Sequence, residues 1–284
     1  MKLIFFKLFF QILLFFDKLS SRKLIYKIIS NFQETSYIEK KILSTNLKFF
    51  VPNEISNWRV KTFFDKEPET LEWIDSFHKD KKIIFWDIGA NIGLYSIYAA
   101  IRHKNIEIVS FEPSTNNLRI LSRNISINNL ENIVKINQFA LSDKANCHEL
   151  MNESEFIEGY SMSTFSYNQD FEGNLLQAKN KYRLFGTSIS NLIEQGILNV
   201  PNYIKIDVDG IEHKILSGAK QVLNNRNLKG MLIEINENYE EQYRSVIDVM
   251  EKFNFKIKYK KQSQFELPEK FKNTFNYIFE RDEI

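Results

Sequence analysis

The chain has 284 residues, of which 43% are hydrophobic and 26% charged, so it can bury a core throughout and lacks the composition of a disordered protein. Its 38 basic and 36 acidic side chains give a net charge of +2. So small a basic excess argues against binding nucleic acid mainly through its phosphates. The single cysteine, Cys147, excludes an intrachain disulfide and fits a reducing compartment, so we expect a cytoplasmic protein.

The N-terminal residues form the one unusual stretch of composition. Leu3 to Phe16 is almost wholly apolar, interrupted only by Lys7 and Gln11, and it is shorter than the roughly 20 residues that span a bilayer. Residues 1–32 carry six basic residues and one acid. We therefore expect this segment either to lie in an anionic interface at the inner face of a membrane, or to pack as a helix on the protein or on a second subunit of a homo-oligomer.

The first elements form an extension before the main fold. The sequence predicts a helical stretch over residues 1–40, two short strands around a Pro-Asn turn over 46–64, and a helix over 69–77 that follows Pro68. We assign residues 1–78 to an N-terminal helical extension with a small strand pair, and residues 79–284 to the main domain.

From residue 82 onward the predicted elements alternate. Strands are expected over 83–88, 106–111, 133–139, 203–208 and 231–235, with helices at 93–103, from 114 onward, around 215–222 and near 240–253. Residues 145–185 are polar and aromatic and are expected to form an irregular insertion. Residues 255–259 and 275–279 are expected to close the chain as an antiparallel strand pair. This alternation predicts an α/β fold with a mainly parallel sheet covered by helices on both faces.

The end of the first of these strands has the features of a cofactor loop. Ligands of such sheets bind beyond the carboxyl ends of the strands. Gly89 and Gly93 allow a tight turn, and Glu112 ends the second strand, where an acid can accept hydrogen bonds from both hydroxyls of an adenosine ribose. Asn91 stands where pyrophosphate needs a bare glycine, and Asp87 is expected to place a carboxylate at the mouth of the loop. Both features favour the cationic S-adenosylmethionine over a dinucleotide.

Five sequence runs are similar to those of a known family: DIGANIG, FEPSTNNLRILSRNISIN, FALSD, YIKIDVDGIEHKILSGAKQVL and MLIEIN. In their order and spacing the chain resembles the FkbM-type methyltransferases from about Phe85 to Phe279. The resemblance implies a Rossmann-like class I methyltransferase fold that uses S-adenosylmethionine to methylate hydroxyls of sugars or other secondary metabolites. It also implies that the cofactor is held by Asp87, Gly89, Asn91, Gly93, Glu112 and, in the FALSD run, Ser142. It implies a reaction centre that contains Lys205, Asp207 and Glu212.

The residues around 207 can be interpreted in more than one way. Asp207 ends a strand at the expected crevice and is the first candidate for a catalytic base or for orienting the acceptor hydroxyl, with anchoring of the strand end as the alternative. Asp209 and Glu212 have the spacing of a capping box, so Glu212 serves either the reaction or the following helix. His213 either accepts a proton near neutral pH or is simply exposed.

Two further groups carry expectations. Lys205 lies in a buried strand and needs an ionic partner, for which Glu234 on the neighbouring strand is the expected one. In the insertion, residues 159–161 with Phe165 and Tyr167 are expected to form either a substrate wall or a surface loop. No spacing of acids demands a metal ion, so none is predicted.

The sequence therefore predicts an S-adenosylmethionine-dependent O-methyltransferase that acts on a hydroxyl of a sugar, glycolipid or secondary metabolite. We expect a small-molecule or glycan substrate and no nucleic acid, because the Asp/Asn-Pro-Pro-aromatic run of nucleic-acid amino methyltransferases is absent. Two alternatives from other classes stay open. One is a nicotinamide-dependent oxidoreductase, and the other is a cofactor-binding protein that has lost catalysis.

Overall fold

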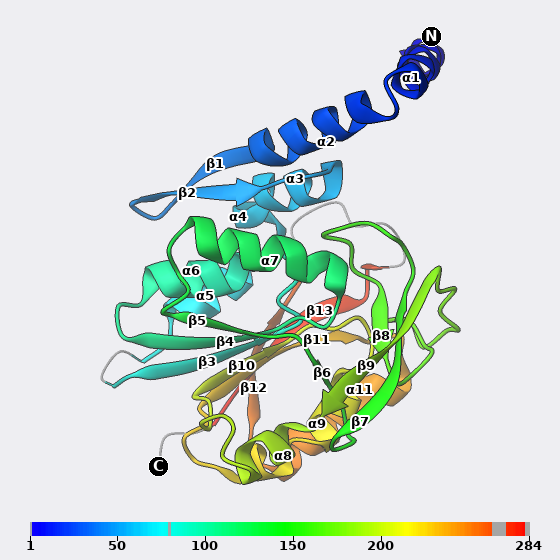
Figure 1. Ribbon diagram of the computed structural model, residues 1–284. Coiled ribbons are helices and arrows are strands. Elements are labelled where there is room, and N and C mark those ends of the chain that lie inside the picture. The colour runs from blue at the N-terminus through cyan, green and yellow to red at the C-terminus, as the bar shows by residue number, and fades with distance from the viewer. Residues whose placement is uncertain (1, 79–80, 263–270, 282–284) are drawn as a thin grey trace.

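The computed structural model describes residues 2–78, 81–262 and 271–281, which build a central seven-stranded sheet in the order β12-β13-β11-β10-β3-β4-β5 (Figure 1). Its strands are β3 (Ile83–Ile88), β4 (Ile106–Phe111), β5 (Val134–Asn137), β10 (Tyr203–Ile206), β11 (Gly230–Asn236), β12 (Lys256–Lys261) and β13 (Thr274–Glu280). Strands β3, β4, β5, β10 and β11 are parallel, and β13 runs antiparallel to both β11 and β12. The predicted mainly parallel sheet with a terminal antiparallel pair is confirmed.

Helices cover both faces of this sheet (Figure 1). One face carries α5 (Pro68–Asp75), α6 (Leu94–Arg102) and α7 (Thr115–Ile127), and the other carries α8 (Ile189–Glu194), α9 (Glu212–Ser217), α10 (Lys220–Asn224) and α11 (Glu240–Lys252). Successive side chains of a strand point to opposite faces. In β3, Phe85 therefore enters the hydrophobic cluster under α6, whereas Trp86 enters the cluster on the opposite face.

The order of the strands reverses between β3 and β10. From β3 the chain proceeds through α6 and α7 to β4 and β5 on one side, while β10 and β11 lie on the other side. At such a reversal the connecting loops diverge and leave a crevice beyond the carboxyl ends of the strands. The fold thus places a ligand site next to Ile88 and Ile206.

The N-terminal segment differs from its prediction in two places. Helices α1 (Lys2–Leu19) and α2 (Lys23–Thr35) are followed by a hairpin of β1 (Tyr37–Ile42) and β2 (Thr45–Phe50). The predicted helical stretch over 1–40 therefore extends too far, because the helical residues end at Thr35. The predicted second strand is instead α3 (Glu54–Lys61), which α4 (Phe63–Lys66) follows. The Asn53 side chain accepts a hydrogen bond from the Ser56 amide at 2.9 Å, and the Ser56 side chain accepts one from the Asn53 amide, which completes a capping box. Pro52-Asn53 therefore begins a helix rather than turning a hairpin.

Residues on both sides of position 78 share one hydrophobic cluster. The ring of Phe77 stacks on Tyr203 of β10 with 3.9 Å between ring centroids, and Trp73 of α5 meets Phe85 of β3 edge to face. Pro68 occupies the first turn of α5, as predicted. The two segments therefore pack against each other across residue 78. A domain boundary at this residue stays a prediction from the sequence.

The insertion is more regular than its composition predicts. A second, four-stranded sheet in the order β6-β9-β7-β8 is built from β6 (Ala140–Leu141), β7 (Cys147–Glu153), β8 (Ser163–Phe165) and β9 (Asn180–Thr187). The prediction of an irregular 145–185 segment is therefore wrong. Antiparallel strands with one solvated face alternate polar and apolar residues, which makes their average composition resemble that of a loop. On the apolar face of this sheet, the side chains of Met151 and Phe165 are buried.

The shared cluster predicts how Phe77 affects stability. Phe77→Ala should lower the free energy of unfolding by about 3–5 kcal/mol, because it removes a ring packed between α5 and the sheet. Phe156, which is 65% exposed, provides the control, and Phe156→Ala should change stability by no more than about 0.5 kcal/mol. Urea unfolding of both variants measures the difference. Equal, small effects would mean that α5 is not part of the cooperative core.

Candidate active site

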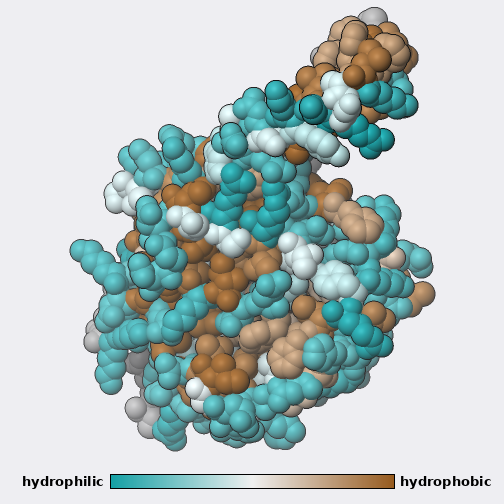
Figure 2. Space-filling view, in the orientation of Figure 1, coloured by the Kyte–Doolittle hydropathy of each residue, from teal (hydrophilic) through white to brown (hydrophobic). Residues whose placement is uncertain are grey.

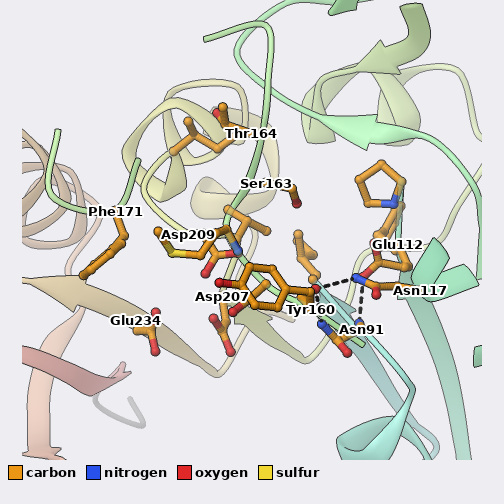
Figure 3. A pocket seen from close by; sticks show the side chains of 18 of the residues that line it. Asn91, Glu112, Asn117, Tyr160, Ser163, Thr164, Phe171, Asp207, Asp209 and Glu234 are labelled. Carbon is orange, nitrogen blue, oxygen red and sulfur yellow. Dashed lines mark hydrogen bonds between the residues drawn. The ribbon is translucent and has the colours of Figure 1, made fainter. Parts of the chain in front are cut away.

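A cavity of about 640 Å³ lies at the carboxyl ends of β3, β4 and β10 (Figure 3). Four segments supply its main walls: the turn after β3, the end of β4, the connection between β7 and β8, and the end of β10. Gly89, Glu112, Tyr160 and Asp207 represent these four segments. The cavity therefore coincides with the reversal of strand order, where the sequence predicted a cofactor.

Two glycines shape the turn after β3, in different ways. Gly89 has φ +82°, and a Cβ there would lie 1.9 Å from the carbonyl oxygen of Asp207. Only glycine lets this turn lie against the end of β10, and Gly89 lines the cavity as expected. Gly93 has φ +88°, and its Cβ would lie 2.5 Å from Leu121 of α7. Gly93 is absent from the cavity wall and allows close packing against α7, while its contact with the cofactor stays a prediction.

Glu112 reaches the cavity from the end of β4. Its carboxylate accepts hydrogen bonds from the backbone amides of Asn91 at 2.7 Å and Ser114 at 2.9 Å. Burial raises the pKa of Glu112 to about 8, although these amide hydrogen bonds oppose the rise. The carboxylate therefore ties the end of β4 to the turn after β3 at the predicted ribose position.

Asn91 and Asn117 hold the loop that closes one side of the cavity. Both side-chain amides donate to the carbonyl oxygen of Tyr160, at 3.3 and 3.1 Å, and the Asn117 carbonyl accepts from the Gly159 amide at 2.8 Å (Figure 3). Arg59 of α3 donates to the Gly159 carbonyl at 2.5 Å. Asn91 lines the cavity as predicted, and its side chain positions the Tyr160 loop.

Asp87 lies away from the cavity, so the expectation that it stands at the mouth of the loop is wrong. The side chain is fully buried, and it accepts a hydrogen bond from Ser96 of α6 at 2.6 Å. Because side chains alternate along a strand, Asp87 points to the same face as Phe85, under α6. Burial raises the pKa of Asp87. Its carboxylate therefore anchors α6 to the sheet.

Lys205 has a different ionic partner from the one predicted. Its ammonium lies 2.7 Å from Oδ2 of Asp207, which directly follows the last residue of β10, rather than beside Glu234. The side chain of Lys205 is 1% exposed and that of Asp207 is 22% exposed. Burial opposes the charge of Lys205, but Asp207, Asp87 and Glu67 outweigh it and raise its pKa. The pair brings a fixed carboxylate to the cavity wall.

Glu67 completes this buried charge network from the N-terminal segment. Burial opposes its ionisation, but Lys66 and Lys205 outweigh that effect and lower the pKa of Glu67 to about 2. Tyr95 of α6 donates to Glu67 at 2.6 Å, and the Lys205 ammonium lies 5.0 Å from the centre of the Tyr95 ring. The network links α4, α6 and β10.

Three further predicted residues, Glu212, His213 and Ser142, lie outside the cavity wall. Glu212 accepts hydrogen bonds from the amides of Val208 at 2.9 Å and Gly210 at 3.1 Å, and it braces the loop after β10 instead of joining the reaction centre. His213 is 5% exposed, and burial lowers its pKa to about 4, so it is neither an exposed residue nor a base beside the cavity. Ser142 is fully buried, and its hydroxyl accepts from the Lys144 amide at 3.1 Å. Of the FALSD run, only Phe139, Ala140 and Leu141 line the cavity.

Asp209 and Glu234 bring two more carboxylates into the cavity beside Asp207 (Figure 3). Asp209 accepts from the Met162 amide at 2.8 Å, whereas the predicted capping role is absent because α9 has Ile211 at its N-cap. Burial and the charge of Asp207 raise the pKa of Asp209 to about 6. Burial and neighbouring carboxylates also raise the pKa of Glu234. This part of the cavity is rich in carboxyl groups, with the cations of Arg59 and Lys66 in the same lining.

The sequence missed the wall that comes from the N-terminal segment. Trp58 and Arg59 of α3, together with Lys66 and Glu67, line the cavity. No signal in the sequence pointed to them, because residues 46–64 were interpreted as strands. In the insertion, Tyr160, Ser161 and Phe165 line the cavity as one interpretation expected, whereas Tyr167 lies outside its wall and donates to Asp143 at 2.8 Å.

Comparisons with known proteins found similarities to methyltransferases. The model of the family described as the methyltransferase FkbM domain matches residues 87–257. Over 59 residues the chain is 41% identical to methyltransferase sdnD of Sordaria araneosa, which is 21% of this chain and only 23% of that relative's length. Similar solved structures include precorrin-6y C5,15-methyltransferase from Geobacter metallireducens, with a TM-score of 0.44, 12% identity and coverage of 76% and 87% of the two chains. TrmK of M. capricolum in complex with S-adenosylhomocysteine has a TM-score of 0.43, 10% identity and coverage of 75% and 68%.

Glu112 generates a prediction for cofactor binding. Glu112→Ala should weaken the binding of S-adenosylhomocysteine by about 1–3 kcal/mol, because the ribose hydroxyls lose a buried acceptor. Isothermal titration calorimetry measures the change. Glu131→Ala, at an exposed glutamate, should bind like the unchanged protein. An unaltered affinity in Glu112→Ala would refute the assignment of Glu112 to the ribose.

The raised pKa of Glu112 also predicts a pH dependence. Below its pKa of about 8 the carboxyl group is protonated, and above it both oxygens can accept hydrogen bonds. The affinity for S-adenosylhomocysteine should therefore rise as the pH increases through about 8. Glu112→Gln cannot ionise, so its affinity should stay constant over the same range. Parallel pH profiles of the two proteins would contradict this role.

Proposed function

Because this chain belongs to the FkbM family of S-adenosylmethionine-dependent methyltransferases, we propose that it methylates a hydroxyl oxygen of a sugar, glycolipid or secondary metabolite. The fold is that of class I methyltransferases, with a parallel sheet and the reversed strand β13. Family membership favours S-adenosylmethionine over the nicotinamide cofactor considered above. For the compartment we propose the cytoplasm, in agreement with the free thiol of Cys147.

The cavity fits S-adenosylmethionine at its β3–β4 side. The bare backbone of Gly89 lines this side of the cavity, and the Glu112 carboxylate suits the ribose hydroxyls. Phe111 and Leu141 offer an apolar wall of the kind that suits an adenine ring. When bound, S-adenosylmethionine supplies an electrophilic methyl group, whose C–S bond breaks as the acceptor oxygen forms a C–O bond.

The observation that carries the proposal is the position of the Asp207 carboxylate. It lines the cavity beside the Gly89 turn, and its backbone amide donates to the Ile88 carbonyl at 3.1 Å. The Lys205 ammonium donates a hydrogen bond to Oδ2 of Asp207, and Oδ1 of Asp207 accepts none from the described residues. This oxygen can orient an acceptor hydroxyl and take its proton as the new C–O bond forms.

Lys205 acts as a positioning residue in this scheme. Its ammonium is held among three carboxylates and fixes the direction of Asp207, because a buried charge adopts the geometry that pairs it best. Alignment is the larger contribution to such a displacement, worth up to about 7–11 kcal/mol, compared with about 10²–10⁴-fold from a general base. A rigid carboxylate therefore serves both purposes.

The remaining carboxylates support a substrate with several hydroxyl groups. Asp209 and Glu234 lie in the same part of the cavity as Asp207 (Figure 3). Carboxylates accept strong hydrogen bonds from hydroxyl donors, and a sugar presents several such donors close together. We infer that the acceptor presents a polyol portion of its molecule to this end of the cavity.

Transfer of an isotopically labelled methyl group tests the proposed reaction. The protein is incubated with labelled S-adenosylmethionine and with saccharide and lipid extracts, and labelled products are analysed by mass spectrometry. A methyl ether survives mild alkali, whereas a methyl ester on a carboxyl group is hydrolysed. Label recovered only on nitrogen, or only as an alkali-labile ester, would refute transfer to a hydroxyl.

Asp207→Asn separates chemistry from cofactor binding. The substitution keeps the shape of the side chain, so the affinity for S-adenosylhomocysteine should change little while single-turnover methyl transfer falls by roughly 10²–10⁴. Retained cofactor binding also shows that the variant is folded despite the weakened pairing of Lys205.

Asp209→Asn is the matched comparison within the same cavity. It should retain most of the single-turnover rate, because the Asp209 carboxylate is engaged by the Met162 amide. If Asp207→Asn reacts at the unchanged rate and Asp209→Asn loses activity, the base is Asp209 and the assignment of Asp207 is wrong.

A further inference from the structure

The helices α1 and α2 form an arm, residues 2–35, which projects away from the body of the protein (Figure 1). Its tip is strongly hydrophobic in the space-filling view (Figure 2). Side chains of α1 that are more than half exposed include Phe5, Phe6, Phe9, Phe15, Phe16 and Leu19. Neighbouring positions point in different directions around a helix, so α1 exposes apolar surface on most of its sides. A surface of this kind on a soluble protein marks a binding site for a partner or a membrane.

The arm is unsuited to crossing a bilayer. None of the described helices is both long and apolar enough to do so. The 18 residues of α1 include Lys7 in the second turn, and Asp17 and Lys18 at its end. A helix that combines large apolar side chains with lysines is instead suited to lying in the interface, where the lysine ammonium groups extend to the lipid headgroups.

The exposed charge of the arm is predominantly positive. Residues 2–35 carry six basic side chains and two acids, Asp17 and Glu34, of which Glu34 is exposed. Asp17 is 4% exposed, and its carboxylate accepts a hydrogen bond from the Ile25 amide at 2.8 Å, which caps the first turn of α2. Asp17 therefore stabilises the bend between α1 and α2. Lys7, Lys23 and Lys27 are exposed to solvent.

We propose that the arm binds an anionic lipid surface. Apolar side chains enter the region between headgroups and acyl chains, while the surrounding cations meet anionic headgroups. A second copy of the chain fits less well, because a symmetric dimer through the arm would bring cationic surfaces against each other. The proposal rests on the exposed surface of the arm and is independent of the reaction assigned to the cavity.

The end of the arm contacts α7 and continues directly into the β1–β2 hairpin. Arg123 of α7 donates to the Gln33 carbonyl at 2.8 Å, near the end of α2. The Arg123 guanidinium also lies 5.0 Å from the centre of the Tyr37 ring and 4.1 Å from that of Phe50. A membrane-bound arm would therefore hold the whole protein at the lipid surface.

Vesicle sedimentation of the full chain tests the proposal. The protein should sediment with vesicles of phosphatidylglycerol and phosphatidylcholine, and far less with pure phosphatidylcholine. Raising the salt concentration should reduce binding, because ions screen the attraction between lysines and headgroups. Binding of S-adenosylhomocysteine, measured in parallel, confirms that each protein sample is folded.

Two sets of substitutions identify the surface responsible. Combining Lys7→Glu, Lys23→Glu and Lys27→Glu should weaken binding to the anionic vesicles by at least about tenfold. The control combines Lys220→Glu, Lys229→Glu and Lys252→Glu, which change the net charge equally at exposed lysines of the body, and it should bind nearly as the unchanged protein does. In a second variant, Phe5→Ser, Phe9→Ser and Phe16→Ser together should abolish binding, whereas Ile197→Ser, at an exposed apolar side chain of the body, should not.

Each other outcome overturns the proposal. Equal binding to neutral and anionic vesicles would remove the role of the lysines, and equal losses in the two sets of lysine variants would mean that overall charge, not the arm, drives binding. Absence of binding to any vesicle would exclude a lipid surface. If sedimentation velocity then shows a dimer that dissociates in the phenylalanine variant, the arm is an interface between copies of the chain.

Discussion

The buried ammonium group of Lys205 is the charge around which the site is organised. A lone ammonium in the interior would be severely unfavourable, so it requires carboxylates from the surrounding segments. Asp207 directly follows its own strand, Asp87 comes from β3, and Glu67 from the segment before the sheet. Because these three carboxylates must converge on one cation, the N-terminal segment, β3 and β10 are held in a common arrangement. The cavity wall formed by α3 and α4 depends on it.

The alternation of side chains along the strands then separates structural acids from those at the cavity. Asp87 shares the face of Phe85 and is directed under α6, where Ser96 holds it. Asp207 and Asp209 lie at and beyond the end of β10, where the chain leaves the sheet, and both reach the cavity. Glu212 lies farther along and holds the loop from behind. Acids of similar appearance in the sequence thus have different environments, and only those in the wall can contact an acceptor.

The two ends of the cavity also differ in character. The β3–β4 side combines a bare backbone turn, apolar residues and the Glu112 carboxylate, whereas the β10–β11 side gathers the carboxyl groups of Asp207, Asp209 and Glu234. This division suits a cationic methyl donor next to a hydroxylated acceptor, and it underlies the proposed reaction. The N-terminal arm instead has exposed cations around an apolar helix. Separate surfaces therefore serve the proposed chemistry and the proposed membrane contact.

The sequence by itself determined the α/β fold, the reversed terminal strands, the turn at Gly89 and the placement of Glu112 and Asp207, because these depend on local periodicity and on where strands end. Only the tertiary structure decided which way side chains point and which distant segments meet. It directed Asp87, Gly93, Ser142, Glu212 and His213 away from the cavity. It brought in Arg59 and Glu67, and it turned residues 147–153 and 180–187 into paired strands. Contacts between residues far apart in the chain are set by packing and charge pairing, which leave no periodic signal in the sequence.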